Sequence, residues 1–402
     1  MASRAATGIR AGGFLLAAFA ALPWPGVAAE IGTPLSPWQR GFLDVHHIAT
    51  GRGNAALLIA PDGTSILIDA GAATGPAETL CEARPDASRP PGEWIGRYVQ
   101  RHLRATGRAA LDYAVLTHLH PDHVGGVADV AALAPIRTVL DRGFPDYAYP
   151  ARWRAPFATA YFAFIAARQK AGEACERMRA GAADQIRLRH GGAGEFLSFA
   201  VRNLAVNGIV WTGRGDETAT AVPALATLAP ADFPDENLCS VALRVSYGRF
   251  DYYTGGDLHC DNADGTQPWR DVETPVAHAA GRVEVAVTNH HAYFDAVGPE
   301  SVRALAPLVW IAPVWHLTHL NIAGLERMLS ERLYAGPRDV FATDLMPATR
   351  LMNDRFMKKV RSAAGHVVVR VAPGGESFRV FVTDHRDERD LVQSATGPYP
   401  CR

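Results

Sequence analysis

The feature that most constrains this chain is an apolar strand that leads directly into a cluster of metal-binding side chains. The run from Leu111 to Thr117 is short, apolar and strand-like. The potential ligands that follow it within six residues are His118, His120, Asp122 and His123. His118 and His120 are two residues apart, so they share a face at the end of an extended strand. Zinc favours imidazole nitrogen and carboxylate oxygen, so the sequence predicts a metal site held by a buried strand.

Two later apolar strands also end in metal-binding residue types. Phe250 to Thr254 is followed by Gly255-Gly256-Asp257, and Val283 to Thr288 is followed by Asn289-His290-His291. Three strands that end in this way indicate one shared edge, where a carboxylate can bridge two metal ions. The alternatives are a solvated histidine-rich loop, a turn aspartate and an exposed histidine pair.

The predicted strands form two groups along the chain, and helical segments follow each group. We expect a hairpin unit over residues 40–72, and the second group lies between residues 196 and 312. Helical patterns cover residues 92–106, 324–334 and 349–364, and a final hairpin surrounds Gly374-Gly375. The order predicts an α/β fold with two sheets packed face to face between helices, a four-layer αββα sandwich.

Residues 145–192 fit this pattern poorly. Tyr161 to Met178 has helical spacing with few helix breakers. We therefore expect one domain over residues 30–402 with a helical insertion at 145–192, over the mouth of the site.

The N-terminal residues have the pattern of a secretory signal peptide. Arg4 and Arg10 precede an apolar run over residues 13–22, and small residues lie just before Glu30. The run is short for a membrane span. This pattern predicts that residues 1–29 are removed and that the protein is exported, periplasmic or secreted, with no membrane association afterwards. An uncleaved N-terminal anchor is the alternative.

Charge and cysteine content limit the remaining classes. The net charge is -1, and a nucleic-acid-binding protein usually has a clear basic excess, so polymeric nucleic acid is the less favoured partner. The cysteines are Cys81, Cys175, Cys239, Cys260 and Cys401. They include no C-x-x-C pair, so a cysteine zinc site is not expected. An exported protein can form disulfides, and we favour a bond between Cys81 and Cys175.

The motifs, in their order along the chain, resemble the metallo-β-lactamase superfamily, and within it the ComEC-type branch, the hydrolase domain of DNA-uptake proteins. Besides the ligand motifs, the resemblance rests on Asp44-Val45 to Gly53-Asn54-Ala55, Pro61-Asp62-Gly63, Leu67-Ile68-Asp69-Ala70-Gly71 and Asn237-Leu238-Cys239-Ser240. It covers roughly residues 42–320.

The resemblance implies a role for each ligand-type residue. His118 and His120 would hold one metal ion, and Asp122 and His123 the other. Asp257 would bridge them. Within the histidine pair, His291 is the preferred ligand of the second ion and His290 the substrate contact, although the two can exchange roles. The residues expected to act in catalysis are Asp122, Asp257 and His290. Asp69 would orient the ligand loop, or be an ordinary core aspartate.

Two departures from the family pattern bear on the substrate. β-Lactamases and lactonases of the superfamily have a further metal histidine between the cluster and the bridging aspartate. Here that interval contains only His190, which we interpret as a loop residue. Asn237 is expected nearer the vacant ligand position. The second departure is Ala292-Tyr293, which replaces the Gly-Ser that follows the histidine pair in the ComEC-type branch.

Four further histidines can border the site. His316 and His319 follow a strand, where related chains place a histidine that reaches the leaving group, but they can equally be a surface pair. His46 and His47 lie near the loop at residues 51–53.

The sequence therefore predicts an exported hydrolase that uses two metal ions and water to cleave a small-molecule phosphoester. An amide, lactone or β-lactam hydrolase of the same superfamily is the first alternative, and a non-catalytic metal-binding module is the second. Two Zn²⁺ ions are expected, and Mn²⁺ or Fe²⁺ can fill the same set of nitrogen and oxygen ligands. The oligomeric state stays open.

Overall fold

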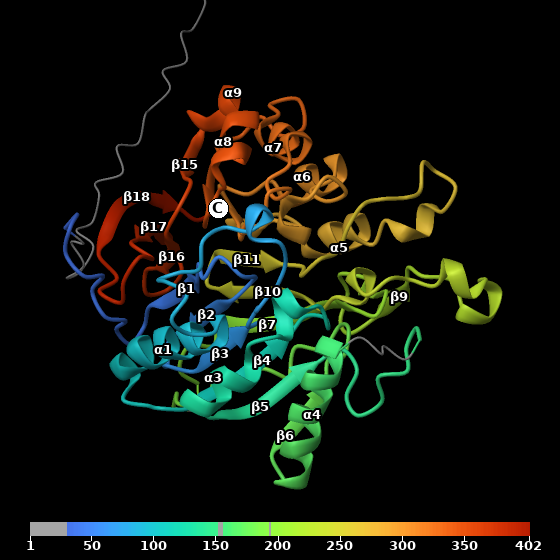
Figure 1. The fold of residues 1–402 in the computed structure, drawn as a ribbon, viewed down its shortest axis with the longest axis horizontal. Coiled ribbons are helices and arrows are strands. Elements are labelled where there is room, and N and C mark those ends of the chain that lie inside the picture. The colour runs from blue at the N-terminus through green and yellow to red at the C-terminus, as the bar shows by residue number, and fades with distance from the viewer. Residues whose placement is uncertain (1–29, 152–155, 193) are drawn as a thin grey trace, which may run out of the picture.

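Two nine-stranded sheets form the centre of the protein in a computed structural model that describes residues 30–151, 156–192 and 194–402. The first sheet has the order β18-β17-β16-β1-β2-β3-β4-β5-β6, and the second has the order β15-β14-β13-β12-β11-β10-β7-β8-β9. Figure 1 shows the sheets with helices around them. The predicted α/β class with two packed sheets is confirmed.

The bounds of the elements are as follows. The first sheet contains β1 (Leu43–His47), β2 (Ala56–Ile59), β3 (Ser65–Ile68), β4 (Leu111–Leu116), β5 (Ile136–Asp141), β6 (Ala174–Arg177), β16 (His366–Val371), β17 (Ser377–Thr383) and β18 (Val392–Pro400). The second contains β7 (Phe199–Val206), β8 (Ile209–Trp211), β9 (Thr218–Thr220), β10 (Ala242–Tyr247), β11 (Phe250–Thr254), β12 (Val285–Val287), β13 (Val309–Ala312), β14 (Asp339–Ala342) and β15 (Val360–Ser362). The α-helices are α1 (Pro91–Leu103), α2 (Pro121–Val124), α3 (Val127–Leu133), α4 (Pro156–Lys170), α5 (Glu273–Ala280), α6 (Pro299–Leu305), α7 (Ile322–Leu329), α8 (Pro347–Met352) and α9 (Asp354–Met357).

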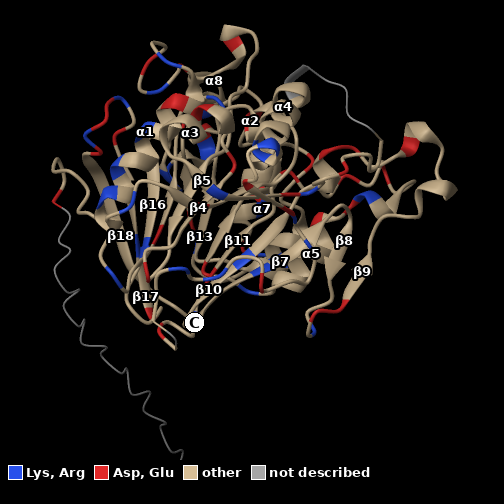
Figure 2. Cartoon of the chain, turned by 90° about the horizontal axis from the view of Figure 1, so that it is seen from below, with Lys and Arg blue, Asp and Glu red and all other residues tan. Residues whose placement is uncertain are grey.

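Alternating side chains along the strands produce the layers. In β2, Leu58 belongs to the apolar core between the two sheets, whereas Leu57 and Ile59 belong to the core under α1 and α3. A third apolar core lies between the second sheet and helices α5, α6 and α7. The central strands of each sheet are therefore buried on both faces, which is why several of them are continuous apolar runs. Figure 2 shows this stacking from a second direction.

Parallel pairing brings the predicted ligand segments to one edge. Strands β3, β4, β5 and β6 run parallel in the first sheet, and β11, β12, β13 and β14 run parallel in the second. The carboxyl ends of β4, β11 and β12 carry the three ligand motifs. The amide of Val241 donates to the carbonyl of Thr117 at 2.9 Å, which joins the end of β4 to the start of β10 across the two sheets. The shared edge that the sequence predicted is present.

Three predicted helices are present but have other bounds than the sequence indicated. The helix expected to reach Met178 ends at Lys170, because Gly172 adopts a left-handed φ of 72° and residues 174–177 form β6. The helix expected over 349–364 is divided into α8, α9 and strand β15. The helix expected over 324–334 spans residues 322–329 instead. The status of residues 145–192 as an insertion stays a prediction.

The predicted disulfide is also wrong. All five cysteines are free. Cys81 is buried, and its Sγ donates to the carbonyl of Asp344. Cys175 lies in β6, the edge strand of the first sheet, rather than in an irregular segment.

The N-terminal prediction falls outside the structure. Residues 1–29, the expected signal peptide, do not belong to the described residues. Within the described part of the chain, no helix has both the length and the apolar character that a membrane crossing requires.

A group of buried histidines lies beneath α1, on the outer face of the first sheet. His46 Nδ1 lies 3.0 Å from the Tyr98 hydroxyl, and His366 Nδ1 accepts from the amide of Ala49 at 3.0 Å. Burial lowers the pKa of His46 to about 4 and that of His366 to about 3, so both rings are neutral near pH 7. His47, on the other face of β1, packs 5.9 Å from the Tyr252 ring.

These buried histidines predict a loss of stability in mild acid. Below the ordinary histidine pKa near 6.5 the unfolded chain binds protons that the folded protein does not, so stability falls as pH falls. His366→Gln removes one such group and should make the decrease shallower, by about 1.4 kcal/mol per pH unit between about pH 6 and pH 4. Denaturant unfolding at several pH values measures this difference. Equal slopes for wild type and variant would contradict the prediction.

Candidate metal centre

The six residues predicted as metal ligands form two groups of donors that share Asp257. The first group contains His118, His120 and Asp257, and the second contains Asp122, His123, Asp257 and His291. Within each group one donor atom from every residue lies within 4.8 Å of the others. Apart from His120 and Asp122, which are partly exposed, these residues are buried. This is the arrangement expected of two adjacent metal positions with a bridging carboxylate.

Asp69, at the end of β3, holds the ligand loop in place. It is fully buried and has a φ of 62°. Its Oδ1 accepts from the Thr117 amide at 2.7 Å, and its Oδ2 accepts from Asn54 Nδ2 at 2.9 Å and lies 2.8 Å from His123 Nδ1. His123 Nδ1 must carry the proton of that contact, because the carboxylate can only accept. The Nε2 atom of His123 is thereby directed at the donor group.

The donor atoms of the second group need a positive charge between them, which a metal ion or an added proton on an imidazole can supply. His291 Nδ1 donates to the carbonyl of Pro313 at 2.8 Å, so its Nε2 carries a lone pair in the neutral ring. This Nε2 lies 3.3 Å from His123 Nε2 and 3.1 Å from Asp122 Oδ2. Two nitrogen lone pairs and two carboxylates that converge on one point repel each other unless a positive charge lies between them. The residues present therefore fit a metal ion.

In the first donor group, His118 is the most deeply buried ligand. His118 is fully buried, and its Nε2 lies 3.0 Å from His120 Nδ1 and 3.5 Å from Asp257 Oδ2. Burial, helped by the neighbouring His123, lowers the pKa of His118 well below its ordinary value. A neutral imidazole is the form that binds a metal ion.

A buried ion pair that sequence reasoning missed supports the same loop. Glu236 Oε1 accepts from the amide of Leu119 at 2.7 Å, between the two ligand histidines. The same carboxylate binds Arg142 Nε at 2.6 Å and Nη2 at 2.5 Å, and both side chains are buried. Glu236 directly precedes Asn237 of the Asn-x-x-Ser motif, which was the available signal. The contact to a backbone amide more than one hundred residues away leaves no pattern in the sequence.

The histidine pair lies in an unusual backbone conformation. His290, His291 and Ala292 have φ values of 43°, 53° and 55°, a left-handed region that residues with side chains rarely adopt. The strained turn is fixed because the His290 amide donates to the carbonyl of Gly256, and the Leu320 amide donates to the carbonyl of His291. Such strain is often retained at functional sites. Here it directs His291 at the second donor group.

His290 lies at the rim of the site. Its Nδ1 lies 2.8 Å from Asp295 Oδ1, and its Nε2 lies 3.3 Å from the side-chain amide of Asn237. Burial opposes protonation, but the hydrogen bond to Asp295 and the nearby carboxylates raise the pKa of His290 to about 9. Among the described residues, His290 belongs to neither donor group.

The remaining candidate histidines separate into three positions. His319 is buried and stacks on His291, with ring centroids 4.6 Å apart, whereas His316 is partly exposed and lies 5.4 Å from His319. His190 lies in a loop, as predicted, with its Nε2 2.9 Å from the carboxylate of Asp112 at the start of β4. That is the opposite end of the strand from His118. His46 and His47 lie in β1 and are members of neither donor group.

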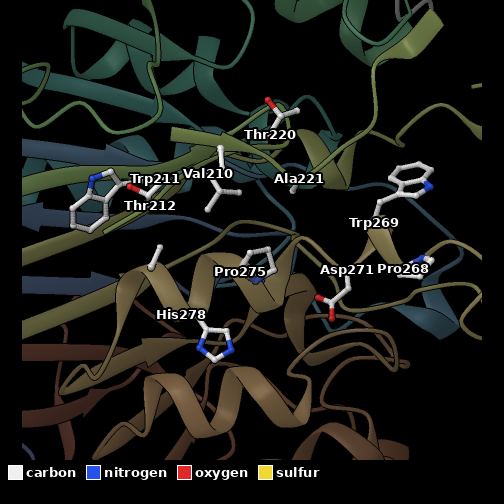
Figure 3. Close-up of a pocket in the computed structure, with 12 residues that line it drawn as sticks. Val210, Trp211, Thr212, Thr220, Ala221, Pro268, Trp269, Asp271, Pro275 and His278 are labelled. Carbon is white, nitrogen blue, oxygen red and sulfur yellow. The ribbon is translucent and has the colours of Figure 1, made fainter. Parts of the chain in front are cut away.

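A cavity of about 590 Å³ lies apart from these residues, beside β8, β9 and α5. Figure 3 shows Trp211, Trp269, Asp271 and His278 around it. No member of the two donor groups lines this cavity.

Comparison with known proteins supports the family. Residues 49–154 match the family model described as the metallo-beta-lactamase superfamily, a range that contains Asp69 and the whole ligand cluster. The match supports a metallo-β-lactamase superfamily domain in this chain. No curated protein matches the sequence.

Solved structures resemble the chain only distantly. A metallo-beta-lactamase from Cronobacter sakazakii with mutations in its HARLDQ motif is 14% identical, with a TM-score of 0.32 over 63% of this chain and 78% of that chain. A diphosphatase from the PhnP family is 11% identical, with a TM-score of 0.34 over 81% and 96% of the two chains. CmlA, a diiron beta-hydroxylase from Streptomyces venezuelae, is 12% identical, with a TM-score of 0.40 over 84% and 55%. At these scores the similarities carry no argument about activity.

The contacts of Asp69 predict its effect on metal binding. Asp69→Asn keeps the size of the side chain but removes the charge that fixes the protonated nitrogen of His123. We expect zinc affinity to fall by about 10–100-fold, the usual range for such a partner of a ligand histidine. Titration calorimetry of metal-free protein measures the change. Asp129→Asn, an exposed position on α3, is the control and should bind as wild type does. Unchanged affinity in folded Asp69→Asn protein would refute the positioning role.

Proposed function

We propose that this chain is an exported two-metal hydrolase that cleaves phosphoester bonds and belongs to the ComEC-type branch of the superfamily. The observation that carries the proposal is the pair of donor groups that share Asp257. Two divalent ions bound there, Zn²⁺ in the first instance, would activate a water molecule and polarise the oxygen of the scissile group.

The protein residues have distinct tasks in this proposal. Asp122 has a side chain that is 14% exposed, so water can reach it, and its Oδ1 can take the proton of the attacking water. His290 is held by Asp295 and donates a hydrogen bond to a substrate oxygen from Nε2. His319 stacks on His291 and keeps that ring in position. No serine or cysteine nucleophile is needed.

The unequal donor groups favour a phosphoester over a β-lactam. The first group has three members where the second has four, and His190 contacts Asp112 instead of completing it. Fewer protein donors leave more coordination positions for substrate oxygens, and a phosphoryl group offers several.

The charge of the protein bears on the size of the substrate. Acidic and basic residues are interspersed over the described chain in Figure 2, and the net charge is -1, which favours a small substrate over polymeric nucleic acid.

A substrate panel tests the proposed reaction. Zinc-loaded protein should hydrolyse bis-(p-nitrophenyl) phosphate, and Asp257→Ala or a chelator should lower the rate by at least about 100-fold, because removing the shared carboxylate disrupts both metal positions. The change in absorbance of released p-nitrophenol measures turnover. A chromogenic cephalosporin and simple lactones complete the panel.

The outcomes separate the alternatives. Turnover of the cephalosporin or of lactones alone would replace the phosphoesterase proposal with the amide, lactone or β-lactam hydrolase. No turnover of any substrate by protein that binds less than one metal ion per chain would favour the non-catalytic module. Adding back zinc to chelated wild-type protein is the control, and it should restore the rate.

A further inference from the structure

A second cavity adjoins the candidate metal centre, and its lining is mainly apolar. It has a volume of about 410 Å³ and is formed by residues 293–294, residues 317–322 and the end of α8. The side chains that line it include Tyr293, Phe294, Leu317, Ile322 and Met352. Cavities of this size commonly bind small molecules. Among its lining residues none is Asp, Glu, Lys or Arg.

The cavity shares its wall with the histidine pair. His319 lines the cavity and stacks on the ligand His291, with centroids 4.6 Å apart. Tyr293 also lines it and packs edge-on against His290 at 5.3 Å. The cavity therefore lies one side chain away from His291, through His319, and one side chain away from His290, through Tyr293.

Hydrogen bonds hold the walls together. Thr349 of α8 donates from Oγ1 to the carbonyl of Leu317 at 2.9 Å, and Asn353 donates from Nδ2 to the carbonyl of Leu320 at 3.0 Å. The amide of Leu320 in turn donates to the carbonyl of His291. The cavity is thus built into the same framework as the ligand turn, which indicates a preformed site.

Exposed apolar side chains are concentrated at this cavity. Phe294 and Met352 line it and are 55% and 62% exposed, and Leu351 beside Met352 is 78% exposed. Phe294 also packs against Tyr293 at 4.6 Å. Single exposed apolar residues are ordinary, but a group of them around a cavity marks a surface that binds an apolar partner.

We propose that this cavity binds the apolar organic group of the substrate, so that the preferred substrates are phosphoesters of alkyl or aryl alcohols. The inference rests on the proposed phosphoesterase function and specifies its substrate class. It also gives a role to Tyr293, which stands where the ComEC-type pattern has a small residue.

Two esters with the same leaving group test the inference. The full chain loaded with zinc is offered methyl p-nitrophenyl phosphate and hexyl p-nitrophenyl phosphate. Each buried methylene favours binding by roughly fourfold, so kcat/KM should be at least about tenfold higher for the hexyl ester even if only part of the chain is buried. In Phe294→Ser/Met352→Ser this ratio should fall by at least about fivefold. Leu197→Ser is the matched control, since Leu197 is 85% exposed and does not line the cavity, and it should keep the wild-type ratio.

Three results would overturn the inference. Equal kcat/KM for the two esters would do so while leaving the proposed function intact. If neither ester is hydrolysed by protein that binds two metal ions, the proposed reaction fails. Calorimetry with hexylphosphonate and methylphosphonate then tests the cavity separately. Equal Kd values for the two phosphonates would exclude binding of the apolar chain in the cavity. Wild type that shows no chain-length preference but sediments with phosphatidylcholine vesicles would assign the patch to a lipid surface.

Discussion

The buried carboxylate of Asp69 is the contact on which the candidate site depends. It lies at the end of β3 and accepts hydrogen bonds from Thr117, Asn54 and His123. A buried charge is costly unless donors surround it, and here those donors come from the end of β4, the ligand loop and the loop before β2. The same bonds that make the charge tolerable fix the direction of a metal ligand. The same hydrogen bonds to Asp69 therefore stabilise the edge of the sheet and set the geometry of the site.

The rest of the site follows from how the two sheets meet. Parallel strands place their carboxyl ends at one edge, so β4 supplies the histidine cluster while β11 and β12 supply Asp257 and His291. The amide of Val241 joins the two edges at the carbonyl of Thr117. The nitrogen lone pairs and carboxylates that converge at that edge repel one another, and bound cations would remove this repulsion. The superfamily match over residues 49–154 covers the half of the site that the first sheet contributes.

The sequence predicted the parts of the structure that leave a local pattern. The apolar strands that end in ligand residues could be predicted. A strand buried on both faces is a run of consecutive apolar residues, and the ligand residues follow it directly in the sequence. Glu236 and the cavity around Met352 were not visible, because they depend on contacts between distant segments. Met178 was assigned to a helix since the spacing of residues 161–170 continues past the point where Gly172 ends it. The predicted bond between Cys81 and Cys175 was wrong because the sequence does not indicate how far apart two cysteines lie in the fold.

Metal stoichiometry tests the central claim most directly. Elemental analysis of purified chain, dialysed against a low concentration of free zinc, should give close to two ions per chain. His120→Ala, which removes a member of the first donor group only, should give close to one. One ion or fewer in the wild-type protein would contradict a two-metal centre at this edge.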